Sequence, residues 1–157
     1  MLKNFVRSAV VAVFSVMTLV SYASENILTL ESQGEENQFT LEQLLPYVDK
    51  EVITSTPWTN GDTTFVGISA KEILHLLGVE NADLKVTALN NYWSRIPYRD
   101  IEKYNPVFAI KKNGQTMSVR DKGPVWLIYP LSEFNEQNNE ILHSRMVWQV
   151  NRIEIIQ

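Results

Sequence analysis

Three segments of the chain carry residue types that suit a flat, hydrogen-bonding ligand. The loops Thr56–Asn60 and Asn90–Trp93 each follow a predicted strand and combine aromatic rings with amides or hydroxyls. A third segment, Arg120–Pro124, brings cations to the start of an apolar run. Aromatic faces supply contact area and amides hydrogen-bond along a ring edge, and loops on a rigid scaffold commonly carry binding groups. The combination predicts a site for a planar heterocycle.

Each of these segments also has an ordinary structural explanation. A tryptophan at a strand end packs in a core more often than against a ligand, and an Asn-Asn pair usually makes a turn. Arg120 and Lys122 also fit a solvated face. Trp126 and Trp148 lie in apolar strands, so we expect both in the core. Trp58 is surrounded by polar turn residues, and for it both explanations stay open.

Other kinds of chemistry find little support. The chain has no cysteine, which excludes disulfides, thiolate metal sites and a cysteine nucleophile. His75 lies on an apolar helix face and His143 in a polar stretch, neither with clustered carboxylates. No Ser/His/Asp set, carboxylate pair or glycine-rich phosphate loop is visible. The net charge of −4 gives no basic footprint for nucleic acid. We therefore assign no catalytic residue, no metal ligand and no nucleic-acid partner.

The first residues have the pattern of a secretory signal peptide. Lys3 and Arg7 precede the apolar run Ala9–Val20, and Ser21-Tyr22-Ala23 fits a cleavage site. A retained membrane anchor is the alternative, but the run is shorter than the ~20 residues that span a bilayer. We expect residues 1–23 to be removed and residues 24–157 to form one periplasmic domain. Loss of both cations makes the mature chain more acidic.

The mature chain alternates short helices and strands. Thr40 with Gln43, and Ser69 with Glu72, predict capping boxes that start two helices, the second ending at Gly78. A helical turn is expected at Arg99–Tyr104. The predicted strands are Ile27–Leu30, Glu51–Thr56, Leu84–Leu89, the hairpin Val107–Lys111 and Gln115–Val119 around Asn113-Gly114, a central strand Val125–Tyr129, and Met146–Ile156. The predicted turns and loops are Gly34–Asn37, Asn90–Pro97 and Leu131–Asn139. This order predicts a single α+β domain with a mixed or antiparallel sheet.

Several segments, taken in order, resemble a known family. They are Thr56–Thr59, Phe65–Leu74, Ala88–Tyr92 with Ile96-Pro97 and Asp100, Asn113-Gly114, Lys122–Pro130 and Arg145–Gln149. They look like the small secreted branch of the sulfite-oxidase-type molybdopterin-binding domain. The resemblance covers nearly the whole mature chain and implies the sulfite-oxidase fold.

One departure from that family concerns its metal. Catalytic members hold molybdenum through one cysteine in a Cys-x-Gly-Asn type loop, and the comparable loop here, Ser55–Gly61, has none. A soft thiolate is the ligand such a metal prefers, so we expect no molybdenum and no redox catalysis. The resemblance is closest to periplasmic pterin-binding proteins that report pterin to a membrane enzyme of cyclic di-GMP metabolism. It therefore implies a non-catalytic protein whose ligand is a reduced pterin.

The resemblance also implies roles for single residues. Trp58 would stack on or wall the pterin ring, and Thr59 is a weaker contact. Asn90, Asn91 and Tyr92 would read the ring edge or its side chain, while Arg120 and Lys122 would donate to a carbonyl or hydroxyls. The expected partner is the periplasmic domain of an inner-membrane signalling protein, docked on the acidic surface. The alternatives are a molybdopterin-dependent oxidoreductase and a ligand-free interaction domain.

Overall fold

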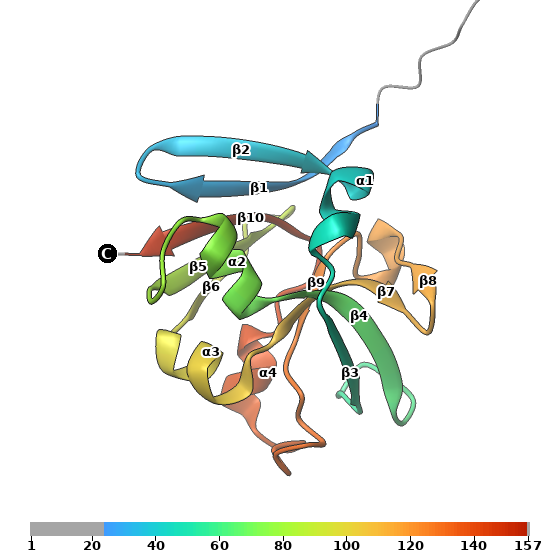
Figure 1. Cartoon of the computed structure of the whole chain (residues 1–157). Helices are drawn as coiled ribbons and strands as arrows, with labels where there is room; N and C mark the ends of the chain where they lie inside the picture. The colour runs from blue at the N-terminus through green and yellow to red at the C-terminus, as the bar shows by residue number, and fades with distance from the viewer. Residues whose placement is uncertain (1–23, 157) are drawn as a thin grey trace, which may run out of the picture.

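The computed structural model describes residues 24–156, so the predicted signal peptide lies outside the described residues. The strands form two sheets (Figure 1). The first sheet has the order β2-β1-β10-β5-β6, in which β1 and β10 are parallel and the other neighbours antiparallel. Its strands are β1 (Asn26–Ser32), β2 (Glu35–Thr40), β5 (Asp83–Ala88), β6 (Trp93–Ile96) and β10 (Val150–Ile156).

The second sheet is antiparallel throughout and has the order β3-β4-β7-β8, with β9 also paired to β7. Its strands are β3 (Lys50–Thr54), β4 (Thr63–Ser69), β7 (Val107–Lys112), β8 (Gln115–Thr116) and β9 (Trp126–Ile128). Short helices connect the strands: α1 (Leu41–Leu44), α2 (Ala70–Leu76), α3 (Tyr98–Tyr104), α4 (Glu140–Arg145) and the 3-10 turns η1 (Leu45–Tyr47) and η2 (Val119–Asp121). The expected single α+β domain with short helices is confirmed, and its strands divide into two sheets.

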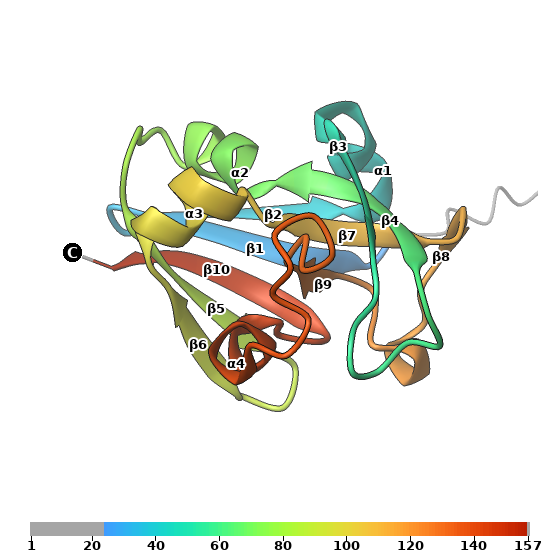
Figure 2. The same cartoon turned by 90° about the horizontal axis from the view of Figure 1, so that it is seen from below.

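One hydrophobic core joins the two sheets. Phe65 and Phe108 from the second sheet, Ile153 from the first, and Trp126 are each at most 1% exposed. Helices α2 and α3 lie together on one side of the molecule, while α4 lies beside β6 at the lower edge (Figure 2). Among residues 24–156, no helix is both long enough and apolar enough to cross a membrane.

The two predicted helix starts differ in detail. Thr40 and Gln43 form a complete capping box, as predicted. Ser69 accepts from the Glu72 backbone N–H at 3.1 Å, but the return bond from Glu72 is replaced. Asp49 accepts from the Ser69 backbone N–H at 2.6 Å and from its hydroxyl at 2.7 Å. A residue distant in sequence therefore completes this cap.

Sheet pairing overturns several local predictions. Predicted turn residues within Gly34–Asn37 enter β2, because an antiparallel partner begins directly after a tight turn. For the same reason the predicted loop Asn90–Pro97 contains β6. The strand expected to be central, Val125–Tyr129, is buried but pairs only with β7. The predicted strand Met146–Ile156 begins only at Val150, and helix α4 had not been predicted.

Candidate functional site

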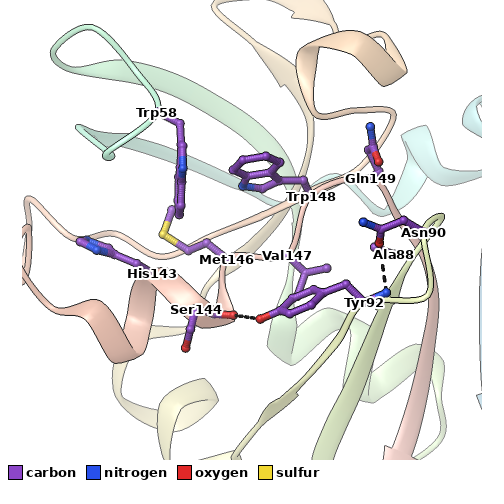
Figure 3. A pocket seen from close by; sticks show the side chains of 10 residues that line it. All are labelled: Trp58, Ala88, Asn90, Tyr92, His143, Ser144, Met146, Val147, Trp148 and Gln149. Carbon is purple, nitrogen blue, oxygen red and sulfur yellow. Dashed lines mark hydrogen bonds between the residues drawn. The ribbon is translucent and has the colours of Figure 1, made fainter.

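A cavity of about 320 Å³ opens between three connections of the fold (Figure 3). They are the loop between β3 and β4, the turn between β5 and β6, and the segment from α4 into β10. The first two connections are the predicted ligand loops. The residues that line the cavity are Trp58, Ala88, Asn90, Tyr92, His143, Ser144, Met146, Val147, Trp148 and Gln149.

Aromatic rings form one wall of this cavity, which we call the aromatic pocket. The ring of Trp58 meets the ring of Trp148 edge to face, with centroids 5.2 Å apart and planes at 83°. The ring centroid of Trp58 lies 6.0 Å from that of His143 and 6.2 Å from that of the buried Trp126. Trp58 and Trp148 are 36% and 38% exposed, so both indoles keep accessible surface. A planar ligand can stack on one indole and meet the other at right angles.

Hydrogen bonds within its own loop position Trp58. The backbone N–H of Trp58 donates to the Thr56 hydroxyl at 3.2 Å, and the Thr59 hydroxyl accepts from the Thr56 N–H at 2.9 Å. Thr59 therefore shapes the loop and does not line the pocket. The tight turn holds the backbone of Trp58, and its indole packs against Trp126 of β9 and His143 of α4.

The opposite wall rests on Tyr92. Asn90 accepts from the Tyr92 backbone N–H at 3.0 Å, and the Tyr92 phenol donates to the Ser144 carbonyl at 2.8 Å (Figure 3). The second bond ties the β5–β6 turn to the last part of α4. Asn91 has a φ of +66°, which shapes the turn, and lines a separate cavity beside Trp93.

Lys122 lies beside the aromatic pocket. Its Nζ atom is 4.6 Å from the centroid of Trp148 and 5.7 Å from that of Trp126, within the range of cation–π attraction. Gln149 holds the two segments together, since its backbone N–H donates to the Lys122 carbonyl at 2.9 Å and its side chain donates to the Val119 carbonyl at 2.8 Å. The cation therefore lies close to the rings of Trp148 and Trp126 but does not line the pocket.

The structure brings together only part of the predicted ligand set. Trp58, Asn90 and Tyr92 line the pocket and Lys122 adjoins it, while Thr59, Asn91 and Arg120 are not among the lining residues. Trp126 is in the core as expected. The placement of Trp148 in the core was wrong, because its ring is partly exposed and lines the pocket.

His143 and Gln149 were also missed as lining residues. Gln149 lies in one of the segments that carry the family resemblance, which was the available signal. His143 Nε2 contacts the Gln137 carbonyl at 2.9 Å, and a carbonyl only accepts. In the neutral ring Nε2 therefore carries the proton, and Nδ1 remains an acceptor.

The chemistry of these residues does not suit molybdenum. In the loop Ser55–Gly61 the hydroxyls of Thr56 and Thr59 bond to each other at 3.2 Å, and neither replaces a thiolate. Across residues 24–156, no three histidine or carboxylate side chains gather as a metal-binding group.

The fold of this chain matches part of a solved structure. No family model and no curated protein matches the sequence. The structure is similar to that of the sulfane dehydrogenase SoxCD from Paracoccus pantotrophus, with a TM-score of 0.58 and 16% sequence identity. The chain has the sulfite-oxidase-type fold. The match covers 82% of this chain but 37% of the SoxCD chain, and at this identity it shows the fold alone.

Proposed function

We propose that the protein binds a reduced pterin without catalysis and reports its presence to a membrane signalling protein. The observation that supports the proposal best is the aromatic pocket, whose indole walls and polar edge suit a flat heterocycle. Its volume of about 320 Å³ lies at the small end of the roughly 300–1,000 Å³ of ligand sites. That size favours a single bicyclic ring over a dinucleotide cofactor.

The polar groups around the pocket offer both donors and acceptors. The Asn90 carbonyl oxygen is engaged by Tyr92, which leaves the amide NH₂ as a donor. The Gln149 NH₂ is engaged by Val119, which leaves its carbonyl oxygen as an acceptor, and His143 Nδ1 is a second acceptor. A pterin carries an amino group, ring N–H groups and a carbonyl along one edge. The two sets are complementary.

SoxCD is a sulfane dehydrogenase, but we propose no redox catalysis for the present chain. The residues of the Ser55–Gly61 loop provide no thiolate, and the chain has no cysteine elsewhere. Without that ligand, the part of the site that remains useful is the ring pocket. We therefore propose a ligand sensor of the periplasm, exported by residues 1–23, that acts on an inner-membrane protein of cyclic di-GMP control.

Two measurements test this proposal. Protein purified from its native compartment is analysed for molybdenum and for released fluorescent pterin, and we expect pterin without metal. Ligand-free protein is then titrated anaerobically with 6,7-dimethyltetrahydropterin by calorimetry, with adenosine as the comparison ligand. Saturable binding of the pterin alone is the expected result. Near-stoichiometric molybdenum, or no binding of any reduced pterin, would overturn the proposal.

A further inference from the structure

A crease with basic side chains lies on the far side of α4 from the aromatic pocket. It consists of two hollows of about 460 and 350 Å³ that share Arg99 and Arg145. Arg95 and Tyr98 line the first hollow, and Lys103 lines the second. We call these two hollows the arginine crease.

Arg145 is fixed in the floor of the arginine crease by a buried carboxylate. Its Nη1 atom lies 2.6 Å from Asp100 Oδ2, and the two side chains are only 18% and 6% exposed. The Tyr129 phenol donates to the same oxygen at 2.9 Å. Burial first, and the charge of Asp100 second, raise the pKa of Tyr129, so the phenol keeps its proton. The guanidinium is thus held in one orientation before any ligand arrives.

A guanidinium has five N–H donors, and the bond to Asp100 uses one of them. Among residues 24–156 the Arg145 side chain makes no hydrogen bond other than that to Asp100, and it lines both hollows, so its remaining donors can serve a ligand there. A partly buried arginine with unused donors is suited to bind an oxyanion in a bidentate manner.

Arg99 adds a cation that lacks a close carboxylate of its own. Arg95 pairs with Asp83 at 2.5 Å and Lys103 with Glu136 at 3.6 Å. Arg99 reaches a carboxylate only at 4.0 Å, and that carboxylate is Asp100, already bound by Arg145. Its side chain is 79% exposed and lines both hollows. One positive charge is therefore in excess at the point where the hollows meet.

We propose that the arginine crease is a second ligand site, which binds the phosphate or carboxylate group of a small anionic molecule between Arg99 and Arg145. Tyr98 lies in the first hollow with a phenol that can donate to the same group. The site is separate from the aromatic pocket, because its lining shares no residue with that pocket. It does not depend on the proposed pterin binding.

Calorimetric titration of the protein with inorganic phosphate and with citrate, in low-salt buffer, tests this site and distinguishes the two anion types. We expect saturable 1:1 binding of at least one of them. Charge-assisted hydrogen bonds of this kind predict that Arg99→Ala weakens binding about tenfold or more. Arg99→Lys keeps the charge but loses the planar set of guanidinium N–H donors, so its affinity should lie between those of Arg99→Ala and the unmodified protein.

Lys112→Ala provides the matched control, because it removes one cation from the distant β7–β8 hairpin. Phosphate or citrate affinity should be unchanged in this variant. Failure of both anions to saturate, or equal losses in Arg99→Ala and Lys112→Ala, would overturn the proposal. Since Arg99 is exposed, its variants should fold, and their titration with 6,7-dimethyltetrahydropterin should match the unmodified protein. That titration separates failure of the anion site from failure of the pterin site.

Discussion

Replacement of Trp58 by alanine is the most direct test of the aromatic pocket. The ring centroid of Trp58 lies 5.2, 6.0 and 6.2 Å from those of Trp148, His143 and Trp126. Trp58 is therefore the ring that all the other rings of this cluster pack against. Loss of base–aromatic stacking in nucleic-acid binders costs about 1–3 kcal/mol. We therefore expect the Kd for a reduced pterin to rise about 5- to 150-fold.

The fold should tolerate this change. The indole is 36% exposed, and the turn that carries it is held by hydroxyl and backbone bonds of Thr56 and Thr59 that remain in the variant. The loss in unfolding free energy should therefore stay below the ~3–5 kcal/mol of a buried aromatic. Urea denaturation followed by circular dichroism measures it.

Anaerobic calorimetry is the appropriate binding assay, because tryptophan fluorescence would itself change in the variant. Trp93→Ala is the matched control, since Trp93 is 54% exposed and lines a different cavity. Trp58→Phe should recover part of the affinity, as it keeps a smaller ring. If Trp58→Ala leaves the Kd within about twofold of the unmodified protein, or if Trp93→Ala weakens binding equally, the stacking role of Trp58 is wrong.

Three further predictions concern stability. Asp100→Ala removes the buried carboxylate that pairs with the partly buried Arg145 and should lower the unfolding free energy by about 3–5 kcal/mol, measured by urea denaturation; a loss like that of a surface substitution would contradict it. Gly67→Ala places a methyl group 2.0 Å from the Phe108 carbonyl oxygen, and overpacking of about 1–3 kcal/mol or more should lower the melting temperature. Burial opposes the charged form of Asp83, but the Tyr98 N–H and Arg95 outweigh burial and lower its pKa. The Asp83 carboxylate therefore stabilises the folded protein at a pH above its pKa in the unfolded chain, and this stabilisation is lost as the pH falls through its pKa in the folded protein. The difference in unfolding free energy between the unmodified protein and Asp83→Asn should therefore disappear below about pH 4.

Local signals in the sequence predict local structure correctly where all the interacting atoms lie within a few residues of each other. The capping box at Thr40 forms as expected because all its atoms lie within four residues. The turn at Asn113-Gly114 also forms where the dipeptide places it, with φ values of +49° and +79°. The strand after this turn is shorter than predicted, since β8 has only two residues before the chain leaves β7. Turn chemistry fixes where a hairpin bends, whereas its length depends on distant packing.

Candidate site residues were predictable where they lie in polar loops that follow strands. Trp58, Asn90 and Tyr92 satisfied that rule and do line the pocket, whereas Thr59 and Asn91 lie in the same loops and do not. Trp148 did not satisfy it, because its apolar neighbours indicate a strand interior. The strand begins only at Val150.

The segment that joins α4 to β10 explains why the missed residues matter. Gln149 has a φ of +52°, so the backbone cannot continue as a regular strand there, and this bend leaves Trp148 beside Trp58. Just before it, His143 faces the aromatic pocket and Arg145 faces the arginine crease. Met146 and Val147 follow in the chain, and because each is only 2% exposed they anchor this segment in the hydrophobic core. A connection that is anchored in the core and has side chains on both of its sides can supply residues to two sites. The hydrophobic periodicity of the sequence does not reveal such an arrangement, because the connection is neither a regular helix nor a regular strand.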